Sequence, residues 1–223
     1  MPTSAAASSS NASASSARSS TAPTPRHEEP TLTDLDLDHR TGWPPELCVL
    51  LDRHPRESWP TAGGIGPTGR FWLQRHDLFR ELTRALDMAA RELREGRVDA
   101  ARFVPWFRPR MGFLLQELHG HHRIEDLHYF PVFQAADPRL ARGFQVLDAD
   151  HHTIDRAIAE LGTASDTLLR ALASTTDDRP GAIAGLATTL PAFLDRLLRH
   201  LDDEEDLVIP LLIERGEGSL GMG

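Results

Sequence analysis

HHRIEDLHYFP at residues 121–131 and RHLDDEEDLVIPLL at residues 199–212 are the two stretches that decide the fold. Each contains a histidine followed four residues later by a glutamate, His121 with Glu125 and His200 with Glu204, and each reaches a proline six residues after the glutamate. On an α-helix, residues four apart project from one face, so the two side chains of each pair can share a metal ion. The repeat therefore predicts two helices that present the same histidine–glutamate unit to a common centre.

Apolar residues recur at helical spacing around these units, and no stretch shows the alternation of a half-buried strand. The spacing predicts four helices with short connections, over residues 69–95, 105–129, 138–174 and 182–207. Pro131 is expected to end or bend the second helix, and Pro210 to stop the fourth. Helices of this kind favour an all-α, antiparallel up-down-up-down four-helix bundle, in which the second and fourth helices are diagonal partners.

The other two helices each carry one histidine on the apolar stripe, His76 on the first and His151 on the third. Counted from the predicted turns at about 1.5 Å per residue, both lie at nearly the depth of His121 and His200. A lone histidine on an apolar face is usually a core residue, but a buried unpaired glutamate is costly. Six such residues at one level predict a bound metal: His76, His121, Glu125, His151, His200 and Glu204.

Several other histidines lie close to these positions in the sequence. His122 and His152 each fall about 100 degrees from the chosen helix face. His152 shares its side with polar residues and is predicted to be exposed, whereas the stripe of His122 is partly apolar. We prefer His121 over His122 as the ligand, and we consider His128 a candidate for a position around the metal rather than on it.

The regions outside the four helices differ in composition. Residues 1–40 are rich in serine and alanine and are predicted to form a disordered tail. Residues 41–68 contain five prolines and several glycines, and are predicted to form an irregular Pro/Gly-rich arm with one short helix, packed on the bundle by its apolar residues. The bundle itself is assigned to residues 69–213, and residues 214–223 to a flexible C-terminal tail.

Composition excludes several functional classes. The formal charge of −9 argues against a nucleic-acid partner, which would require a basic face. Cys48 is the only cysteine, so the chain forms neither an internal disulfide nor a thiolate metal site. No stretch approaches the roughly 20 apolar residues that span a bilayer, and the N-terminus lacks the apolar core of a secretory signal. We therefore expect a cytoplasmic protein without a membrane partner.

Four motifs resemble those of one known family. HHRIEDLHYFP and RHLDDEEDLVIPLL, with WLQRHDLFREL and LDADHHTID, are similar to the motifs of the hemerythrin-like, or HHE cation-binding, family, over about residues 70–213. The resemblance implies a four-helix bundle that holds two non-haem iron ions bridged by two carboxylates. Carried over to this chain, the terminal ligands would be His76, His121, His151 and His200, and the bridges would be Glu125 and Glu204.

The chain departs from the oxygen-carrying members of that family. Asp155 stands where those members have a second histidine on the third helix. Glu204 and Glu205 follow His200 by four and five residues, where those members have an aspartate at five. Fewer imidazoles and more carboxylates give a more oxygen-rich site, and whether Asp155 or Glu205 also binds metal stays open. A ferritin-like site would need a second Glu-x-x-His motif, and a structural zinc would need only four ligands.

These features support two main functional hypotheses. The first is a protein that binds or senses oxygen, nitric oxide or peroxide, or buffers iron, because no second cofactor motif is recognisable. The second is a di-iron enzyme with peroxidase-like or catalase-like activity, suggested by the carboxylate-rich site and by Tyr129 as a redox-active residue nearby. A third alternative, an inert helical interaction module, predicts full folding without metal.

Overall fold

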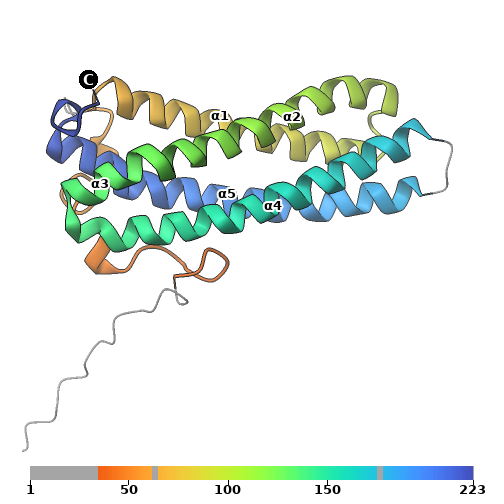
Figure 1. Cartoon of the computed structure of the whole chain (residues 1–223). Helices are drawn as coiled ribbons and strands as arrows, with labels where there is room; N and C mark the ends of the chain where they lie inside the picture. The colour runs from red at the N-terminus through yellow and green to blue at the C-terminus, as the bar shows by residue number, and fades with distance from the viewer. Residues whose placement is uncertain (1–34, 62–64, 175–177, 223) are drawn as a thin grey trace, which may run out of the picture.

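The structure, a computed structural model, describes residues 35–61, 65–174 and 178–222. Those residues form helices, turns and loops and contain no strand, which confirms the all-helical prediction. The long helices lie side by side in Figure 1. They are α1 (Pro67–Arg94), α2 (Ala100–Ile124), α4 (Ala141–Ala173) and α5 (Arg179–Arg215).

The packing of these helices brings distant parts of the chain together. Helix α1 packs against α2 and α5, and α4 packs against the same two helices, so α2 and α5 face each other diagonally. A π-helical turn, η3 (Glu125–Tyr129), the short helix α3 (Phe130–Ala136) and a 3-10 turn, η4 (Pro138–Leu140), connect α2 with α4. Further 3-10 turns lie in the arm, η1 (Pro45–Leu47) and η2 (Arg56–Ser58), and after α5, η5 (Glu217–Leu220).

Two of the helix ends differ from the prediction. Helix α2 begins at Ala100 rather than at 105, because the Asp99 carboxylate accepts a hydrogen bond from the Arg102 amide at 2.9 Å and caps the helix. Pro210 does not stop the last helix, which continues to Arg215. A proline removes one helical hydrogen bond, but Leu211 and Leu212, which follow Pro210, are buried and keep the chain helical by packing.

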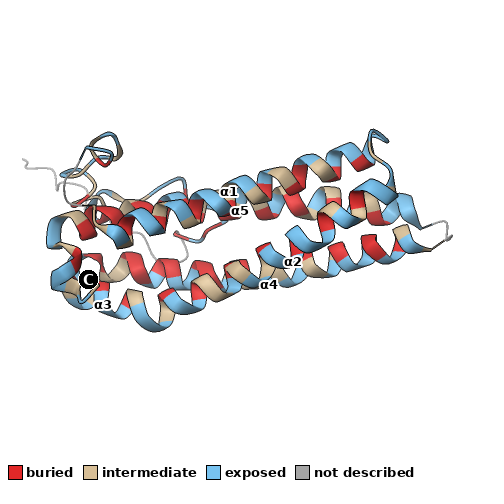
Figure 2. Cartoon of the chain, turned by 90° about the horizontal axis from the view of Figure 1, so that it is seen from above, coloured by how far each residue is buried: buried red, intermediate tan, exposed pale blue. Residues whose placement is uncertain are grey.

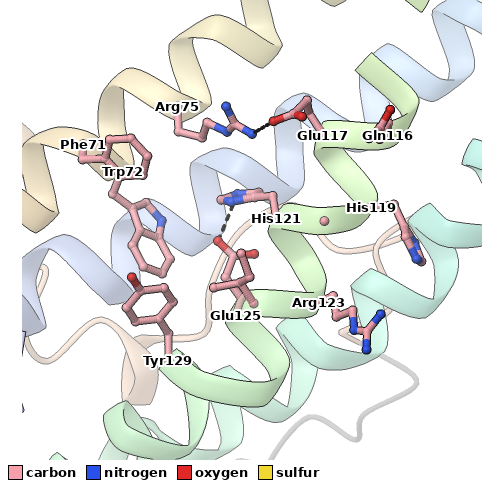
Figure 3. Close-up of a pocket in the computed structure, with 12 residues that line it drawn as sticks. Phe71, Trp72, Arg75, Gln116, Glu117, His119, His121, Arg123, Glu125 and Tyr129 are labelled. Atoms are coloured by element: carbon pink, nitrogen blue, oxygen red, sulfur yellow. Dashed lines mark hydrogen bonds and ion pairs between the residues drawn. The ribbon is translucent and has the colours of Figure 1, made fainter. Parts of the chain in front are cut away.

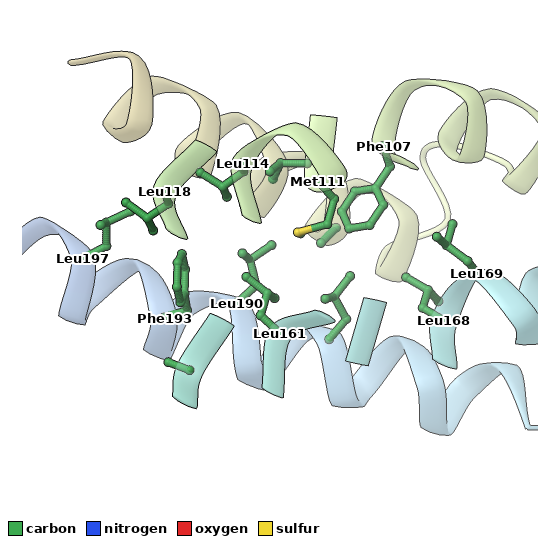
Figure 4. Close-up of a cluster of buried hydrophobic side chains, with 14 of the residues drawn as sticks. Phe107, Met111, Leu114, Leu118, Leu161, Leu168, Leu169, Leu190, Phe193 and Leu197 are labelled. Carbon is green, nitrogen blue, oxygen red and sulfur yellow. The ribbon is translucent and has the colours of Figure 1, made fainter. Parts of the chain in front are cut away.

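The core consists of two apolar clusters, one toward each end of the bundle. Figure 2 shows buried residues recurring along each long helix. Figure 4 shows the larger cluster, in which Phe107 and Leu114 of α2 and Phe193 of α5 point into the space between the helices. On α1, His76 lies between Trp72 of the smaller cluster and Phe79 of the larger. A polar layer therefore separates the two clusters.

Parts of both predicted tails pack on the bundle. Leu37 and Arg40 are buried, although they belong to the range 1–40 that was expected to be disordered; residues 1–34 of that range lie outside the described residues. At the other end, Glu217 accepts hydrogen bonds from the amides of Thr68 at 3.0 Å and Gly69 at 2.7 Å. The carboxylate thus satisfies the free amides at the start of α1, so this segment has a structural role rather than the expected flexible one.

Helix α5 also has the length and composition of a membrane span, and it is the one described helix that does. Core helices of soluble proteins meet the same criteria, so this property alone does not assign a membrane location. In the bundle, α5 packs against α1 and α4.

Candidate metal centre

The polar layer between the two apolar clusters brings together all six residues predicted to bind metal, and it adds His122. The seven side chains form two groups, within each of which the nearest ligand atoms lie within 4.8 Å of one another. The first group is His76, His121, Glu125 and Glu204, and the second group is His122, His151 and His200. Each group therefore draws its ligands from three helical segments or more, as convergence in a bundle core requires.

In the first group, imidazole nitrogens and carboxylate oxygens face one another at short range. The Nε2 atoms of His76 and His121 are 3.2 Å apart. His121 Nε2 lies 2.9 Å from Glu125 Oε1, and His76 Nε2 lies 3.4 Å from Glu204 Oε1. His76, Glu125 and Glu204 are almost completely buried.

The second group repeats this arrangement on the other side of the two carboxylates. The Nε2 atoms of His151 and His200 are 3.1 Å apart. His200 Nε2 lies 3.1 Å from Glu204 Oε2, and His151 Nε2 lies 3.6 Å from Glu125 Oε2. The ring of His122 stacks on that of His151, with centroids 4.1 Å apart and an interplanar angle of 11°.

The two glutamates therefore divide their oxygens between the groups. Glu125 directs Oε1 to His121 and Oε2 to His151, and Glu204 directs Oε1 toward His76 and Oε2 toward His200. Carboxylates placed in this way are able to bridge two metal ions, each of which has its own set of histidines.

Several buried polar atoms of the layer lack hydrogen bonds but could bind a metal ion. Both ring nitrogens of His122, both oxygens of Glu125 and Oε2 of Glu204 are buried and make no hydrogen bond within the described structure. These carboxylate oxygens make ion-pair contacts with the ligand histidines, at 2.9–3.6 Å. Buried groups of this kind are rare, because an unsatisfied polar atom costs about 1–3 kcal/mol. Metal coordination satisfies several of them at once, so the donor set fits bound cations.

Three further carboxylates hold the outward nitrogens of the ligand histidines. Glu205 Oε1 lies 3.0 Å from His76 Nδ1, and Asp126 Oδ1 lies 2.6 Å from His151 Nδ1. On the remaining side, Asp150 Oδ2 lies 3.4 Å from His200 Nδ1. A carboxylate at Nδ1 fixes the proton on that nitrogen, so Nε2 presents its lone pair to the centre.

The charges of the metal-free centre follow from burial and proximity. Burial, together with the charge on Glu204, raises the pKa of Glu125 well above its ordinary value. Burial opposes ionisation of Glu204 as well, but His76 and His200 outweigh it and hold the pKa of that carboxyl well below its ordinary value. Burial and the neighbouring histidines lower the pKa of His122 well below its ordinary value, so His122 stays neutral, which is the form that binds a metal.

His122 is the residue that the helical pattern missed. It lies next to His121 in the sequence, and adjacent residues point about 100° apart on a helix, so a single ligand-bearing helix face includes only one of the two. The centre has two groups rather than one, so adjacent histidines on α2 supply one group each. The only signal in the sequence was the partly apolar stripe that includes this histidine.

The structure also resolves the other residues that the sequence left open. Glu205 lies outside the two groups, where it contacts His76 Nδ1. Asp155 also lies outside the two groups and pairs with His119 at 3.3 Å on the surface. His152 is exposed as predicted, and His128 is exposed too, so it does not take the expected position around the metal.

A cavity of about 590 Å³ lies between α1 and α2 and reaches the first group (Figure 3). Trp72 and Tyr129 line one side, with ring centroids 5.0 Å apart, and His121 and Glu125 stand at the side of the metal centre. A cavity of this size is typical of small-molecule sites. Small molecules can therefore approach the centre from solvent without rearrangement of the bundle.

The fold and the donor set together define a helical protein with two groups of side chains between its helices that are able to hold metal cations. The family model of the hemerythrin HHE cation-binding domain matches residues 69–212, well over half of the chain. This chain belongs to the hemerythrin HHE cation-binding family, as the sequence motifs indicated. A search of curated proteins and a search of solved structures gave no match.

Proposed function

We propose that this chain binds two non-haem iron ions, one in each group, with Glu125 and Glu204 as shared ligands. It uses them to bind or sense oxygen, nitric oxide or peroxide, or to buffer iron. The proposal includes the antiparallel up-down-up-down topology of hemerythrin-like bundles, which is supported by the path of the chain in Figure 1.

The observation that carries the proposal is the division of each glutamate's oxygens between two histidine groups. A single structural zinc needs four ligands and no bridge, whereas seven inward side chains exceed that number. Imidazole with carboxylate is a donor set that suits iron. Bound iron would supply an open coordination position and electrons for the small molecule.

The residues of the chain itself would restrict what reaches this position. Trp72 donates a hydrogen bond from Nε1 to Glu204 Oε1 at 2.6 Å and so fixes the orientation of one shared carboxylate. The apolar clusters above and below the layer exclude water from the bundle axis. The cavity between α1 and α2 gives a route of entry to the first group.

The first test is the metal content of the full chain after anaerobic reconstitution with ferrous iron. Elemental analysis is expected to give close to two irons per chain, and Glu204→Gln, which removes the charge of one shared ligand, is expected to give clearly less. One zinc, or well under one iron per chain in the unmodified protein, would contradict the proposal. Optical spectra with oxygen, nitric oxide and peroxide then identify which molecule the iron-loaded protein binds.

A second test addresses the route of entry. Gly120 lines the cavity, and a Cβ atom added there meets no other atom within 4 Å, so Gly120→Leu fills the space without disturbing the helix. Gly112, two turns earlier on α2, is equally open but does not line this cavity, so Gly112→Leu is the matched control. We expect Gly120→Leu alone to slow the reaction with nitric oxide at unchanged iron content. Equal rates in both variants would exclude this route.

The alternative function is peroxidase-like turnover, and one contact favours it. Tyr129 lies against Trp72 at 5.0 Å between centroids, and Trp72 is hydrogen-bonded to Glu204, so two oxidisable aromatic rings connect the cavity with a shared ligand. If the protein is an enzyme of this kind, Tyr129→Phe is expected to lower sustained peroxide consumption at unchanged iron content. Reversible spectral change with no turnover in the unmodified protein would favour binding or sensing.

A further inference from the structure

The described residues 35–61 comprise the end of the predicted tail and most of the predicted arm, and are together called the arm from here on. This arm places a buried arginine close to the metal centre. Arg40 is 3% exposed. Its guanidinium makes a two-pronged contact with the Asp150 carboxylate, in which Nη1 donates to Oδ1 at 2.8 Å and Nη2 donates to Oδ2. Its Nε donates to Asp203 Oδ2 at 2.7 Å. Two-pronged contacts of this kind hold a carboxylate in one orientation.

Asp150 connects this arginine with a ligand. Its Oδ2 atom lies 3.4 Å from Nδ1 of His200, whose Nε2 faces Glu204. The arm therefore reaches the second group through a buried chain of three residues, Arg40, Asp150 and His200. Moving the guanidinium would release the carboxylate that orients the His200 ring.

A second arginine of the arm repeats the arrangement at the first group. Arg56 Nη1 donates to Glu205 Oε2 at 3.0 Å, and the other oxygen of Glu205 lies 3.0 Å from His76 Nδ1. Arg80 of α1 supports the same carboxylate at 2.7 Å, so Glu205 is held from two sides. One arginine of the arm thus lies behind the histidines of each group.

The third carboxylate provides an internal contrast. Asp126 contacts His151 Nδ1 at 2.6 Å, but no arginine contacts Asp126 in the described part of the chain. Asp126 is also the most exposed of the three, with its side chain 29% exposed against 2% for Asp150 and 4% for Glu205. The arginines of the arm therefore contact the two carboxylates that are shielded from water. Solvent does not balance the negative charge of these two groups, so an arginine is needed to do so.

We propose that Arg40 and Arg56 are positioning residues of the metal centre, so that the arm is a functional part of the site. The family match begins at residue 69, so both arginines lie outside it. Each guanidinium fixes a carboxylate that orients a ligand histidine, and each balances negative charge beside the metals. The inference rests on the proposed iron binding.

A purely structural role is the competing explanation, because ion pairs also attach the arm to the bundle. Arg53 distinguishes the two roles. It lies in the same arm and pairs with Glu214 of α5, but this contact leads to no ligand, and His54 makes a second contact with Glu214 at 2.8 Å. Arg53→Met therefore weakens the attachment of the arm and leaves the carboxylate–histidine contacts in place.

The experiment compares full-length Arg40→Met, Arg56→Met and Arg53→Met after reconstitution with ferrous iron. The readouts are the rate of iron loss to a chelator and the midpoint potential. Outer partners of metal ligands change metal affinity by about 10–100-fold, so Arg40→Met and Arg56→Met are expected to lose iron about 10-fold faster or more. Removing a positive charge favours the ferric state, so their midpoint potentials are expected to fall. Arg53→Met is expected to match the unmodified protein in both readouts.

Arg40→Met removes the arginine from two buried carboxylates, Asp150 and Asp203, and could prevent folding. Arg40→Lys keeps the positive charge but cannot make the two-pronged contact with Asp150. It is therefore expected to fold and to give an intermediate rate of iron loss. Arg56, whose side chain is 38% exposed, gives a second variant that folds. The inference would be overturned if Arg40→Lys and Arg56→Met lost iron at the same rate as Arg53→Met and had the same midpoint potential. Absence of iron in the unmodified protein would instead refute the proposed function.

Discussion

Replacing Trp72 with phenylalanine removes a single donor from the metal centre and keeps an aromatic ring in its place. The indole Nε1 donates to Glu204 Oε1 at 2.6 Å, and both residues are buried. The other ring contacts of Trp72, such as those with Tyr129 and Phe133, are compatible with the smaller ring. The substitution therefore tests how strongly the chain fixes one shared carboxylate before metal binds.

The expected loss of unfolding free energy in Trp72→Phe follows from the charge of the hydrogen-bond acceptor. His76 and His200 hold the pKa of Glu204 well below its ordinary value, so the indole donates to a charged carboxylate. Hydrogen bonds to charged groups contribute about 1.5–3 kcal/mol, against about 0.5–1.5 kcal/mol for neutral pairs. Trp59 provides the neutral reference, because its Nε1 donates to the backbone carbonyl of His54 at 2.7 Å and its side chain is similarly buried.

Urea denaturation of the metal-free protein measures the free energy of unfolding of both variants. Each loses the same volume of aromatic ring. The Arg56 guanidinium lies 4.9 Å from the centroid of the Trp59 ring, and a phenyl ring at this position can keep that contact, so the main difference between the two variants is the acceptor. Trp72→Phe is expected to cost about 1 kcal/mol more than Trp59→Phe. Titration with ferrous iron is expected to show about 10-fold weaker binding in Trp72→Phe and no change in Trp59→Phe.

Equal destabilisation by the two substitutions would show that the Glu204 contact is no stronger than a neutral hydrogen bond. Iron binding that is unchanged in Trp72→Phe would show that the indole does not orient the shared carboxylate. Either result would refute the assignment of Trp72 as a residue that prepares the centre for metal.

Three further predictions concern the centre and the ends of the bundle. His122→Phe replaces two unsatisfied buried nitrogens, so it is expected to raise the unfolding free energy of the metal-free protein by about 1 kcal/mol and to lower iron retention; the exposed His152→Phe should change neither. The ion pair with Arg139 lowers the pKa of Asp137 from 3.8 to about 2. The folded-state pKa is depressed, so the corresponding stability, about 1 kcal/mol because solvent screens the half-exposed Arg139, is present above pH 4 and is lost as the pH falls toward 2. Denaturation across this range should show no such loss for Asp137→Asn. Glu217→Ala removes the cap of α1 and is expected to cost about 1–2 kcal/mol in the same assay; an unchanged midpoint would show that the cap contributes nothing.

Much of this fold could be predicted from the spacing of apolar residues. A helix buries one stripe of its surface, and the residues of that stripe recur at helical intervals in the sequence. The same logic placed His76, His121 and His200 at one level, and the structure brings them together in the polar layer. Helix ends were less predictable. Asp99 begins α2 earlier than the prolines suggested, and Pro210 fails to stop α5 because tertiary packing outweighs one lost hydrogen bond.

The sequence by itself thus determined the helical class, the family and six inward-facing side chains, since these depend on spacing within single helices. Only the tertiary structure decided that His122 joins the centre, because a site with two groups accepts neighbours that point in different directions. It also decided that Arg40 and Arg56 lie behind the ligand histidines. Those contacts join residues more than 100 positions apart, and no local pattern encodes which distant carboxylate an arginine will meet.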